Sequence, residues 1–419
     1  MLIGVIADDF TGATDIAGFL VASGVSTTQL IGVPPADLSV DAEAVVISLK
    51  SRSCPPEEAV ATSLAALDWL RARDCPRVFQ KYCSTFDSTR KGNIGPVADA
   101  LLDALGSDFT VVCPALPING RTIYNGYLFV GDVLLEESGM RDHPINPMTD
   151  SSLVRLMEMQ SLGRAGVVRT AVIDQGVAAV KAALDALRAA GRRYAVLDAI
   201  KESHLDVLGA AIADMPLVTG GSGLAAGMAK AWRRRIQDPS RAALAGAPQP
   251  GRGVVISGSA SQMTNRQVAE YKAKAPSFPV DPVRCLADQS GYAREMAAWV
   301  MAQPKGGPSP MLYATTDPET LKEIQARFGA AASMAIEATF AALARQLAEA
   351  GFTRFVVAGG ETSGAVVQAL GVSGFHIGPQ IAPGVPWVRA VDKPYSLALK
   401  SGNFGAPSFF FDCQEKVAG

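Results

Sequence analysis

Short runs of β-branched and other apolar residues alternate with longer segments of helical periodicity along almost the whole chain. This alternation is typical of parallel sheets, because each parallel strand needs a long crossover connection, usually a helix, before the next strand. Strands are predicted at residues 2–7, 28–31, 44–49, 78–82, 109–113, 171–173, 194–197, 216–218, 253–256, 311–314, 355–358, 387–391 and 397–399. Helices are predicted at residues 56–73, 177–190 and 331–352. The predicted fold class is therefore α/β.

The 419 residues are enough for two domains at roughly 100 to 200 residues each. A boundary is predicted where residues 237–252 read QDPSRAALAGAPQPGR, because prolines and glycines interrupt both the helical and the strand period there. We expect an N-terminal domain over residues 1–236, a linker over 237–252 and a C-terminal domain over 253–419. Each would be a three-layer α/β domain with a mainly parallel sheet.

Charge and hydropathy exclude several classes of partner. The 38 Lys and Arg residues nearly balance the 40 Asp and Glu residues, so the formal charge of −2 favours neither nucleic acid nor an anionic membrane. No stretch reaches the roughly 18 apolar residues of a membrane span, and the N-terminal apolar run lacks the basic segment of a signal peptide. Six cysteines without a CxxC pair predict reduced, structural thiols. We expect a cytoplasmic protein with small-molecule partners.

The segment IADDFTGATD, residues 6–15, directly follows the first predicted strand. Ligands of open parallel sheets bind beyond the carboxyl ends of the strands, so this segment is predicted to line a site. Asp8 and Asp9 could bind Mg²⁺, accept a proton or hold substrate hydroxyls, with Thr11 and Asp15 in the helix that follows. Helix capping is the competing explanation, and it accounts for one of these acids rather than for all of them.

A second polar loop, QKYCSTFDSTRKGNIGP at residues 80–96, joins a predicted strand to a helix that starts near Ile94. Hydroxyls, cations and a helix N-terminus together predict an anion site that needs no metal, and Arg52 adds a cation from the end of another strand. A carboxylate-bearing polyol would match this mixture, although a solvated turn is the ordinary explanation for a Lys/Arg pair alone. The candidate substrate-binding residues are Thr11, Asp15, Arg52, Lys81, Ser84, Asp87, Ser88, Lys91 and Asn93.

A third segment, FVVAGGETSG at residues 355–364, consists of a buried strand, paired glycines and the start of a helix. Backbone N–H groups in such a turn can face a phosphate, whereas a tight glycine turn alone leaves Thr362 and Ser363 unexplained. Similar loops are ISGSASQMT and KSGNFG. The Gly-Lys-Ser/Thr ending of a Walker A loop is missing, so Mg²⁺ and a cation from the other domain are predicted to neutralise the phosphates.

Several other enzyme signatures are excluded. TGGSGLAAG, residues 219–227, lacks the following strand and the acidic ribose ligand of a dinucleotide site, so it is predicted to be a strand-to-helix turn. The sequence contains no GxSxG motif and no Cys-His signature, and its three histidines are scattered. Hydrolase chemistry is therefore unsupported.

The chain resembles the four-carbon acid sugar kinase family in IADDFTGATD, KYCSTFDSTxKGNIGP, CPALPINGRTIYNGYLFVG, MRDHPINPMTDS, VTGGSGLAAG, VISGSAS, AGGETSG and SGNFG. These segments occur in order over nearly the whole chain, and they are long enough to be specific. Arg90 departs from the pattern, in which Pro is more usual, and it adds a cation beside Lys91.

This resemblance implies an ATP-dependent kinase that phosphorylates the terminal C4 hydroxyl of a four-carbon sugar acid, with 3-oxo-tetronate as the leading substrate. The acid sugar would bind the N-terminal domain and ATP the C-terminal domain, with the active site in an interdomain cleft. For such a reaction we expect Asp8 or Asp9 to accept the proton of the attacking hydroxyl or to hold Mg²⁺, and Arg52, Lys81 or Lys91 to hold the substrate carboxylate. Nucleotide contacts would fall on Ser257, Gly258, Ser259, Gly359, Gly360, Glu361, Thr362, Ser363 and Gly402.

Three alternatives stay open at this point. D-Threonate, D-erythronate or L-threonate could be the substrate, because a hydroxyl and a carbonyl are distinguished only by angstrom-scale placement of side chains. A nicotinamide-dependent sugar-acid dehydrogenase and a non-catalytic sugar-acid binding protein are the other two. A homodimer is also compatible with the sequence, since closed symmetric dimers are common among enzymes.

Overall fold

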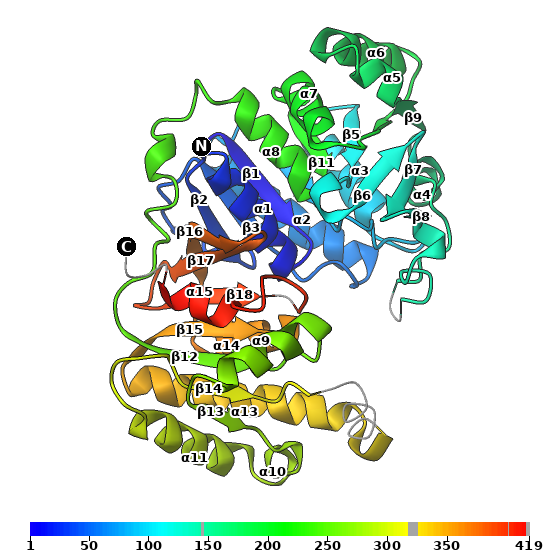
Figure 1. The fold of residues 1–419 in the computed structure, drawn as a ribbon. Coiled ribbons are helices and arrows are strands. Elements are labelled where there is room, and N and C mark those ends of the chain that lie inside the picture. The colour runs from blue at the N-terminus through cyan, green and yellow to red at the C-terminus, as the bar shows by residue number, and fades with distance from the viewer. Residues whose placement is uncertain (144–145, 317–325, 401, 416–419) are drawn as a thin grey trace. The chain divides into compact units, whose positions relative to one another are not determined.

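The computed structural model describes residues 1–143, 146–316, 326–400 and 402–415. The chain divides into two compact units, Met1–Ala242 and Ala243–Gly419, and each combines a mainly parallel set of strands with helices (Figure 1). The predicted α/β class is confirmed. None of the described helices is long and apolar enough to cross a bilayer.

The strands of the first unit form a parallel array. They are β1 (Ile3–Ala7), β2 (Thr27–Ile31), β3 (Ala44–Ser48), β4 (Val78–Lys81), β5 (Thr110–Cys113), β9 (Ala165–Val168), β10 (Tyr194–Leu197) and β11 (Leu217–Gly220). Their order is β2-β3-β1-β4-β11-β5-β10-β9, and neighbouring strands are parallel. The strands β1, β3 and β4 are buried along their whole length, which is why they read as continuous apolar runs in the sequence.

The helices of the first unit cover both faces of these strands. They are α1 (Phe10–Ala22), α2 (Pro56–Arg71), α3 (Ile94–Ala104), α4 (Leu153–Gln160), α5 (Thr170–Ile173), α6 (Val177–Ala189), α7 (Glu202–Ile212) and α8 (Ser222–Ala231), with short 3₁₀ turns at Pro117–Asn119, Leu135–Glu137 and Pro239–Arg241. The crossovers through α1 and α7 run in one direction along the sheet and those through α2 and α3 in the other. Right-handed crossovers of opposite direction place helices on opposite faces. In agreement, α1 packs on α8 and α8 on α7, whereas α2 packs on α3.

A small antiparallel sheet is inserted after β5. Its strands are β6 (Arg121–Tyr124), β7 (Tyr127–Val130) and β8 (Val133–Leu134). The turn between β6 and β7 is an Asn-Gly pair with positive φ at both residues, 53° at Asn125 and 78° at Gly126, as a tight hairpin requires. Both backbone N–H groups donate to the carboxylate of buried Asp198 over 2.9 Å, which ties the hairpin to the end of β10.

The second unit repeats the parallel design with an antiparallel edge. Its elements are β12 (Arg252–Ser257), α9 (Gln262–Lys272), β13 (Ser277–Pro279), α10 (Pro282–Ala287), α11 (Gln289–Ala302), β14 (Met311–Tyr313), α13 (Ala330–Glu349), β15 (Phe352–Ala358), α14 (Gly360–Ala369), β16 (Gly374–Ala382), β17 (Val385–Ala390), β18 (Ser396–Lys400) and α15 (Phe409–Glu415). The strand order is β13-β14-β12-β15-β18-β17-β16, and β17 is antiparallel to both of its neighbours. The helices α10, α11 and α14 pack against α13, while α15 packs against α9.

The strands β6, β7, β8, β9, β13 and β16 were not predicted, and one predicted strand is a helix. Residues 171–173 were predicted as a strand from their β-branched side chains, but they belong to the helix α5, and the strand of this region is β9. Asp198 accepts hydrogen bonds from the backbone N and the hydroxyl of Thr170, so a contact from a distant strand stabilises the start of α5 against the local preference. The strand β16 was missed because Pro379 and two glycines, Gly374 and Gly378, interrupt its apolar pattern.

Candidate active site

The first candidate site lies where the strand connections of the first unit diverge. Ala7 is in register with both Ser48 and Lys81, so β3, β1 and β4 end at the same level of the sheet. The chain leaves β1 toward β2 on one side and leaves β4 toward β5 on the other. Ligands of open α/β sheets bind at such a switch point. The polar segments that follow these three strands are therefore brought together, as the sequence predicts.

Asp9 is the N-cap of α1. Its Oδ1 accepts a hydrogen bond from Gly12 N over 2.7 Å, and its Oδ2 accepts one from Thr11 Oγ1 over 3.1 Å. The capping explanation that the sequence left open therefore applies to Asp9. It does not apply to Asp8, whose carboxylate has a different partner.

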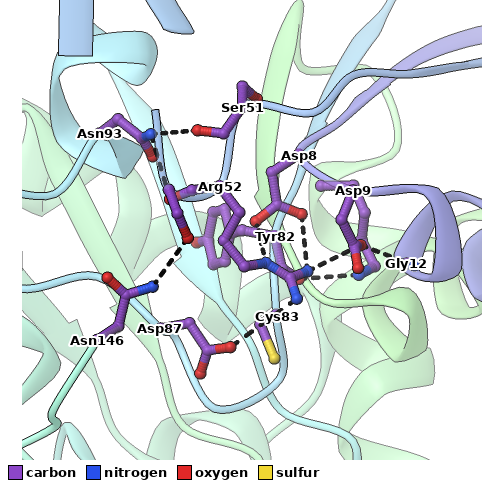
Figure 2. Close-up of polar contacts among 12 residues, drawn as sticks. Asp8, Asp9, Gly12, Ser51, Arg52, Tyr82, Cys83, Asp87, Asn93 and Asn146 are labelled. Carbon is purple, nitrogen blue, oxygen red and sulfur yellow. Dashed lines mark hydrogen bonds and ion pairs between the residues drawn. The ribbon is translucent and has the colours of Figure 1, made fainter. Parts of the chain in front are cut away.

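Arg52 joins the acidic side chains (Figure 2). Its Nε lies 2.8 Å from Asp8 Oδ2 and its Nη2 lies 2.9 Å from Asp8 Oδ1, which is a bidentate pair. The same Nη2 lies 2.8 Å from Asp9 Oδ1, and Nη1 lies 3.9 Å from Asp87 Oδ2. One guanidinium thus orients carboxylates from segments that are far apart in the sequence.

Burial sets the electrostatics of this group. Burial raises the pKa of the Asp8 carboxyl, and the charge of Arg52 with its hydrogen bonds acts in the opposite direction without cancelling the rise. For Arg52, burial alone would lower the pKa, but the neighbouring Asp8 carboxylate raises it above the ordinary value, so the guanidinium stays charged. Each charge therefore depends on the other for compensation in a poorly solvated site.

Lys81 and Asp15 also lie near the start of α1. Lys81 is 3% exposed, and its Nζ donates a hydrogen bond to Tyr82 O over 2.9 Å. A Cβ at Gly12 would clash with Asp9 Oδ1 and lie 3.0 Å from Lys81 Nζ, so both charged groups approach the backbone where a side chain is missing. Asp15 accepts a hydrogen bond from Ser222 at the start of α8, and burial raises the pKa of the Asp15 carboxyl against the opposing effect of Lys81.

The loop after β4 is held in a strained conformation. Phe86 and Asp87 have φ values of 64° and 40°, a left-handed region that bulky residues rarely adopt. The ring of Phe86 is 1% exposed and packs edge-on against Tyr82 with a centroid separation of 5.6 Å. Thr85 Oγ1 donates to Asp87 Oδ1 over 2.6 Å. These contacts stabilise the turn that directs Asp87 toward Arg52.

The remaining predicted substrate residues divide into two groups. Ser88 and Asn93 are buried and stabilise the loop. Ser88 Oγ donates to Gln160 Oε1, at the end of α4, over 2.8 Å, and Asn93 Nδ2 donates to Ser51 O. Lys91 is exposed and Ser84 is partly exposed. The predicted substrate-binding roles of all these residues stay predictions.

A second switch point occurs in the second unit. Ser257 is in register with Ala358, and Ala358 with Lys400, so β12, β15 and β18 end at one level. The chain leaves β12 toward β13 and leaves β15 on the opposite side. The three glycine-rich segments of the sequence begin at these strand ends, where ligands bind in open α/β sheets.

These loops are joined through their backbones. Gly258 N and Ser259 N both donate to Ala358 O, over 2.9 and 3.2 Å, and Gly359 N donates to Lys400 O over 2.8 Å. The loops therefore form one structural group. The loop after β12 is hydrogen-bonded to the last residue of β15, and the loop after β15 is hydrogen-bonded to the last residue of β18.

Glycine is needed here for close approach. Gly359 has φ 124°, and a Cβ there would lie 3.0 Å from Thr362 Oγ1 and 3.2 Å from Ser259 N. A Cβ at Gly258 would clash with the same Thr362 hydroxyl, and one at Gly402 would lie 2.9 Å from Ser259 Oγ. Side chains at these positions would separate the loops and fill the space between them.

The helix α14 begins inside this group of loops. A Cβ at Gly360 would meet no atom within 4 Å, so the backbone at the start of the helix is open. Glu361, Thr362 and Ser363 complete the first turn. The buried Ser363 Oγ has no hydrogen-bond partner within the described ranges. Helix N-termini favour anions, and buried hydroxyls are normally paired, so this turn fits a phosphate group.

Lys400 is a residue that the sequence analysis did not select. Its side chain is fully buried, and its Nζ donates to Thr264 Oγ1 over 3.0 Å and to Gly402 O over 2.6 Å. Burial lowers the pKa of Lys400 to about 8. The available signal was a lysine directly after the strand predicted at residues 397–399 and directly before the glycine-rich SGNFG.

The carboxylates offer a limited site for Mg²⁺. Among the described residues, no three His, Cys, Asp or Glu side chains lie close enough together to bind a metal ion without other ligands. Mg²⁺ bound with a nucleotide usually needs only one or two carboxylates besides the phosphates. Both oxygens of Asp8 are engaged by Arg52, whereas Asp9 Oδ2 has the Thr11 hydroxyl as a neutral partner. Asp9 therefore fits the ion better.

Comparisons with known proteins identify the family. Residues 3–228 match the family described as a sugar-binding N-terminal domain, and residues 254–410 match that described as a nucleotide-binding C-terminal domain. A Brucella melitensis protein named 3-oxo-tetronate kinase is 62% identical over 417 residues, which cover 99% of this chain and 95% of the relative. The chain belongs to the four-carbon acid sugar kinase family. A Salmonella typhimurium protein with the same name is 58% identical, with 99% of each chain covered.

Solved structures agree with this assignment to the four-carbon acid sugar kinases. A Haemophilus influenzae protein has a TM-score of 0.89 at 54% identity, covering 99% of this chain and all of that chain. A Salmonella typhimurium LT2 protein, described as a tRNA synthase, has a TM-score of 0.95 at 58% identity and the same coverage. The family resemblance that the motifs indicate is therefore confirmed. The sugar-binding match contains Arg52 and the three acids around it, Asp8, Asp9 and Asp87, which we call the Arg52 group. The nucleotide-binding match contains the loops around Gly359.

Proposed function

We propose that this chain transfers the γ-phosphoryl group of ATP to the C4 hydroxyl of 3-oxo-tetronate. The observation that carries the proposal is the presence of two different sites in one chain. The Arg52 group lies in the part that matches a sugar-binding domain, and the glycine-rich loops lie in the part that matches a nucleotide-binding domain. Relatives named 3-oxo-tetronate kinase are 51% to 62% identical to this chain over nearly all of its length.

In the proposed mechanism, Asp9 orients the attacking hydroxyl. Phosphoryl transfer depends mainly on positioning and on charge stabilisation, with a carboxylate to hold the nucleophile. The side chain of Asp9 is 25% exposed, and its Oδ2 is bound only by a neutral hydroxyl in the described contacts. The side chain of Asp8 is 14% exposed and accepts two hydrogen bonds from Arg52, so Asp8 would instead position that guanidinium.

The substrate carboxylate needs a cation that is not already paired. Arg52 uses Nε and Nη2 for Asp8 and Asp9, so it is better suited to organising the acids than to binding the substrate by itself. Lys81 donates to a neutral carbonyl, and Lys91 is exposed. We propose that these two lysines hold the substrate carboxylate, with Arg52 Nη1 as a further donor.

The nucleotide phosphates would be held by the second unit. Gly359, Gly360 and the first turn of α14 offer open backbone and the unpaired Ser363 hydroxyl, and Ser259 approaches from the loop after β12. Mg²⁺ bound with the nucleotide would supply additional positive charge for the transferred group, and Asp9 is the carboxylate that would fit it as a protein ligand. Lys400 would place positive charge beneath the same loops.

The test is ADP release from purified protein with ATP, Mg²⁺ and a panel of four-carbon acids. We expect turnover with 3-oxo-tetronate, generated in the assay by a dehydrogenase, and much lower kcat/KM with D-threonate, D-erythronate and L-threonate. Release of ADP with D-threonate or D-erythronate, and none with 3-oxo-tetronate, would make the chain a kinase of that acid in the same family. Reduction of a nicotinamide cofactor by this protein, or tight binding of acids without any ADP, would contradict the kinase.

The charge of the chain bears on whether RNA is a partner. The description of one structural relative as a tRNA synthase raises an RNA-linked activity, but a formal charge of −2 supplies no general attraction for a polyanion. A homodimer and a cytoplasmic location stay predictions.

Lys400 makes nucleotide binding pH-dependent in a measurable way. Its pKa of about 8 leaves it largely neutral at pH 8.5, and phosphates nearby would raise that pKa. We therefore expect ADP binding at pH 8.5 to take up roughly half a proton, measured by calorimetry in buffers of different ionisation enthalpy. Lys400→Met should abolish the uptake and weaken ADP binding. Lys393→Met, an exposed lysine of the same unit, is the control.

A second readout uses the protein without nucleotide. The unfolded chain holds the Lys400 proton up to the ordinary lysine pKa, whereas the folded protein releases it near pH 8. The unfolded state therefore binds more protons between these values, and the free energy of unfolding should rise with pH across that interval. Lys400→Met should flatten this rise. An unchanged slope and unchanged proton uptake in the variant would show that Lys400 does not titrate in this way.

A further inference from the structure

The second unit contains a cavity at the opposite end of its strands from the nucleotide loops. Its volume is about 360 Å³, within the range of small-molecule sites. It is lined by the starts of β12 and β15, the end of α11 and the loop from Pro304 to Pro310. Gly253 in this lining precedes Ser257 by four residues of the same strand, about 13 Å at the usual rise. The cavity is therefore separate from the phosphate-binding loops.

The lining is cationic. Arg252, Lys305 and Arg354 contribute side chains, and no Asp or Glu lies among the lining residues. None of the three cations forms an ion pair within the part of the chain that the structure describes. Three uncompensated positive charges around one cavity repel one another, and an anion in the cavity would relieve that repulsion.

Arg354 shows that the charge is not simply solvated. Its side chain is partly buried, and its Nε is fully buried without a hydrogen-bond partner among the described residues. Burial also lowers the pKa of Arg354. A buried donor of a charged group is normally paired, since leaving it unpaired costs more than for a neutral group. Because Arg354 lines the cavity, an anion there would meet a guanidinium that water does not fully solvate.

Two further features shape the cavity for a ligand. The guanidinium of Arg252 lies over the ring of Phe352, with Cζ 4.2 Å from the ring centroid, which limits the orientations of its planar donors. Ser309 is fixed by its backbone, because its N donates to Gln414 over 2.7 Å and its O accepts from Tyr271 over 2.6 Å. A Cβ at Gly253 would lie 2.7 Å from Ser309 Oγ, so this hydroxyl faces the start of β12.

We propose that this cavity binds a small molecule that carries a phosphate group. Guanidinium groups match phosphate oxygens bidentately, and the cavity offers two of them together with an ammonium group and a hydroxyl. The volume exceeds that of one phosphate, so there is room for the organic part of a phosphate ester. The site would be occupied independently of the nucleotide loops.

The test is calorimetric titration of the whole protein with ADP and Mg²⁺ already saturating the nucleotide site. Inorganic phosphate, pyrophosphate and glycerol 3-phosphate are the probes. We expect one further site per chain. Arg354→Gln and Lys305→Gln should each weaken its affinity roughly 10-fold or more, because each removes a charge-assisted contact. Tighter binding of glycerol 3-phosphate than of inorganic phosphate would assign the site to a phosphate ester, and the reverse order to the free anion.

The controls separate this site from general attraction. Lys305 is exposed, so Lys305→Gln tests the proposal even if Arg354→Gln impairs folding. Arg345→Gln removes an exposed cation of α13 that does not line the cavity. The proposal is overturned if no probe binds once ADP is saturating. It is also overturned if Lys305→Gln binds like the original protein, or if Arg345→Gln weakens binding as much as the cavity variants.

Discussion

Asp9→Asn is expected to lower kcat by roughly 10²- to 10⁴-fold while ATP affinity and the fold stay nearly unchanged. The substitution removes the negative charge that would orient the attacking hydroxyl and assist Mg²⁺. It keeps the helix cap, because Asn caps helices about as well as Asp and Gly12 N retains an acceptor. Steady-state ADP release and thermal unfolding with and without ATP would measure the two effects separately.

Two further variants bracket this result. Asp37→Asn, at an exposed loop position, should leave kcat unchanged. Asp9→Ala should lose turnover to a similar extent and should also lower the free energy of unfolding by about 1 kcal/mol, since the cap of α1 is removed. Near-normal turnover of Asp9→Asn would exclude Asp9 from the catalytic role and return that role to Asp8.

Arg52→Met is expected to lower the free energy of unfolding by about 3 to 5 kcal/mol and to abolish turnover. The variant leaves Asp8, whose side chain is 14% exposed, without its bidentate partner. The pKa of Asp8 is already raised by burial and should rise further. The folded variant would then bind a proton that the unfolded chain has released, so its stability should fall as the pH rises above the unfolded Asp pKa. Urea denaturation at pH 5 and pH 8 would detect this slope.

The double variant Arg52→Met/Asp8→Asn separates stability from catalysis. Removing the unpaired carboxylate should restore most of the lost stability and should remove the pH dependence that Asp8 contributes, without restoring turnover. Arg234→Met, an exposed arginine of the same unit, should change neither quantity. If the double variant is as unstable as Arg52→Met, the uncompensated charge of Asp8 is not the cause. If it regains turnover, Arg52 is not needed for the reaction.

Most strands were predictable because each is a short apolar run buried along its length. The predicted limits of β1, β4 and β18 differ from the observed ones by one residue or two. The errors at residues 171–173 and in β16 have different origins. At the start of α5, Thr170 N donates to Asp198, 28 residues away, so a distant contact decides that segment. The strand β16 pairs with β17, which follows it directly in the sequence, but Pro379 and two glycines interrupt its apolar pattern.

The polar loops were also predictable, since their residues follow strand ends, where ligands of α/β sheets bind. Their internal pairing was not. Arg52 is one of three cations predicted to hold the substrate carboxylate, and that role stays a prediction. Its pairing with Asp8, which lies 44 residues earlier in the chain, was not predicted. Lys400 was passed over although its loop was recognised, because a lysine at a strand end gives no sign of being buried.

The sequence by itself determined the α/β class, the polar and glycine-rich segments and the family resemblance, because these depend on local periodicity and on the order of motifs along the chain. The tertiary structure alone decided which charges compensate one another, as at Asp8 and Arg52, and which remain unpaired, as around Arg354. Burial and distance set the energy of a charge, and both arise only when segments far apart in the sequence are packed together.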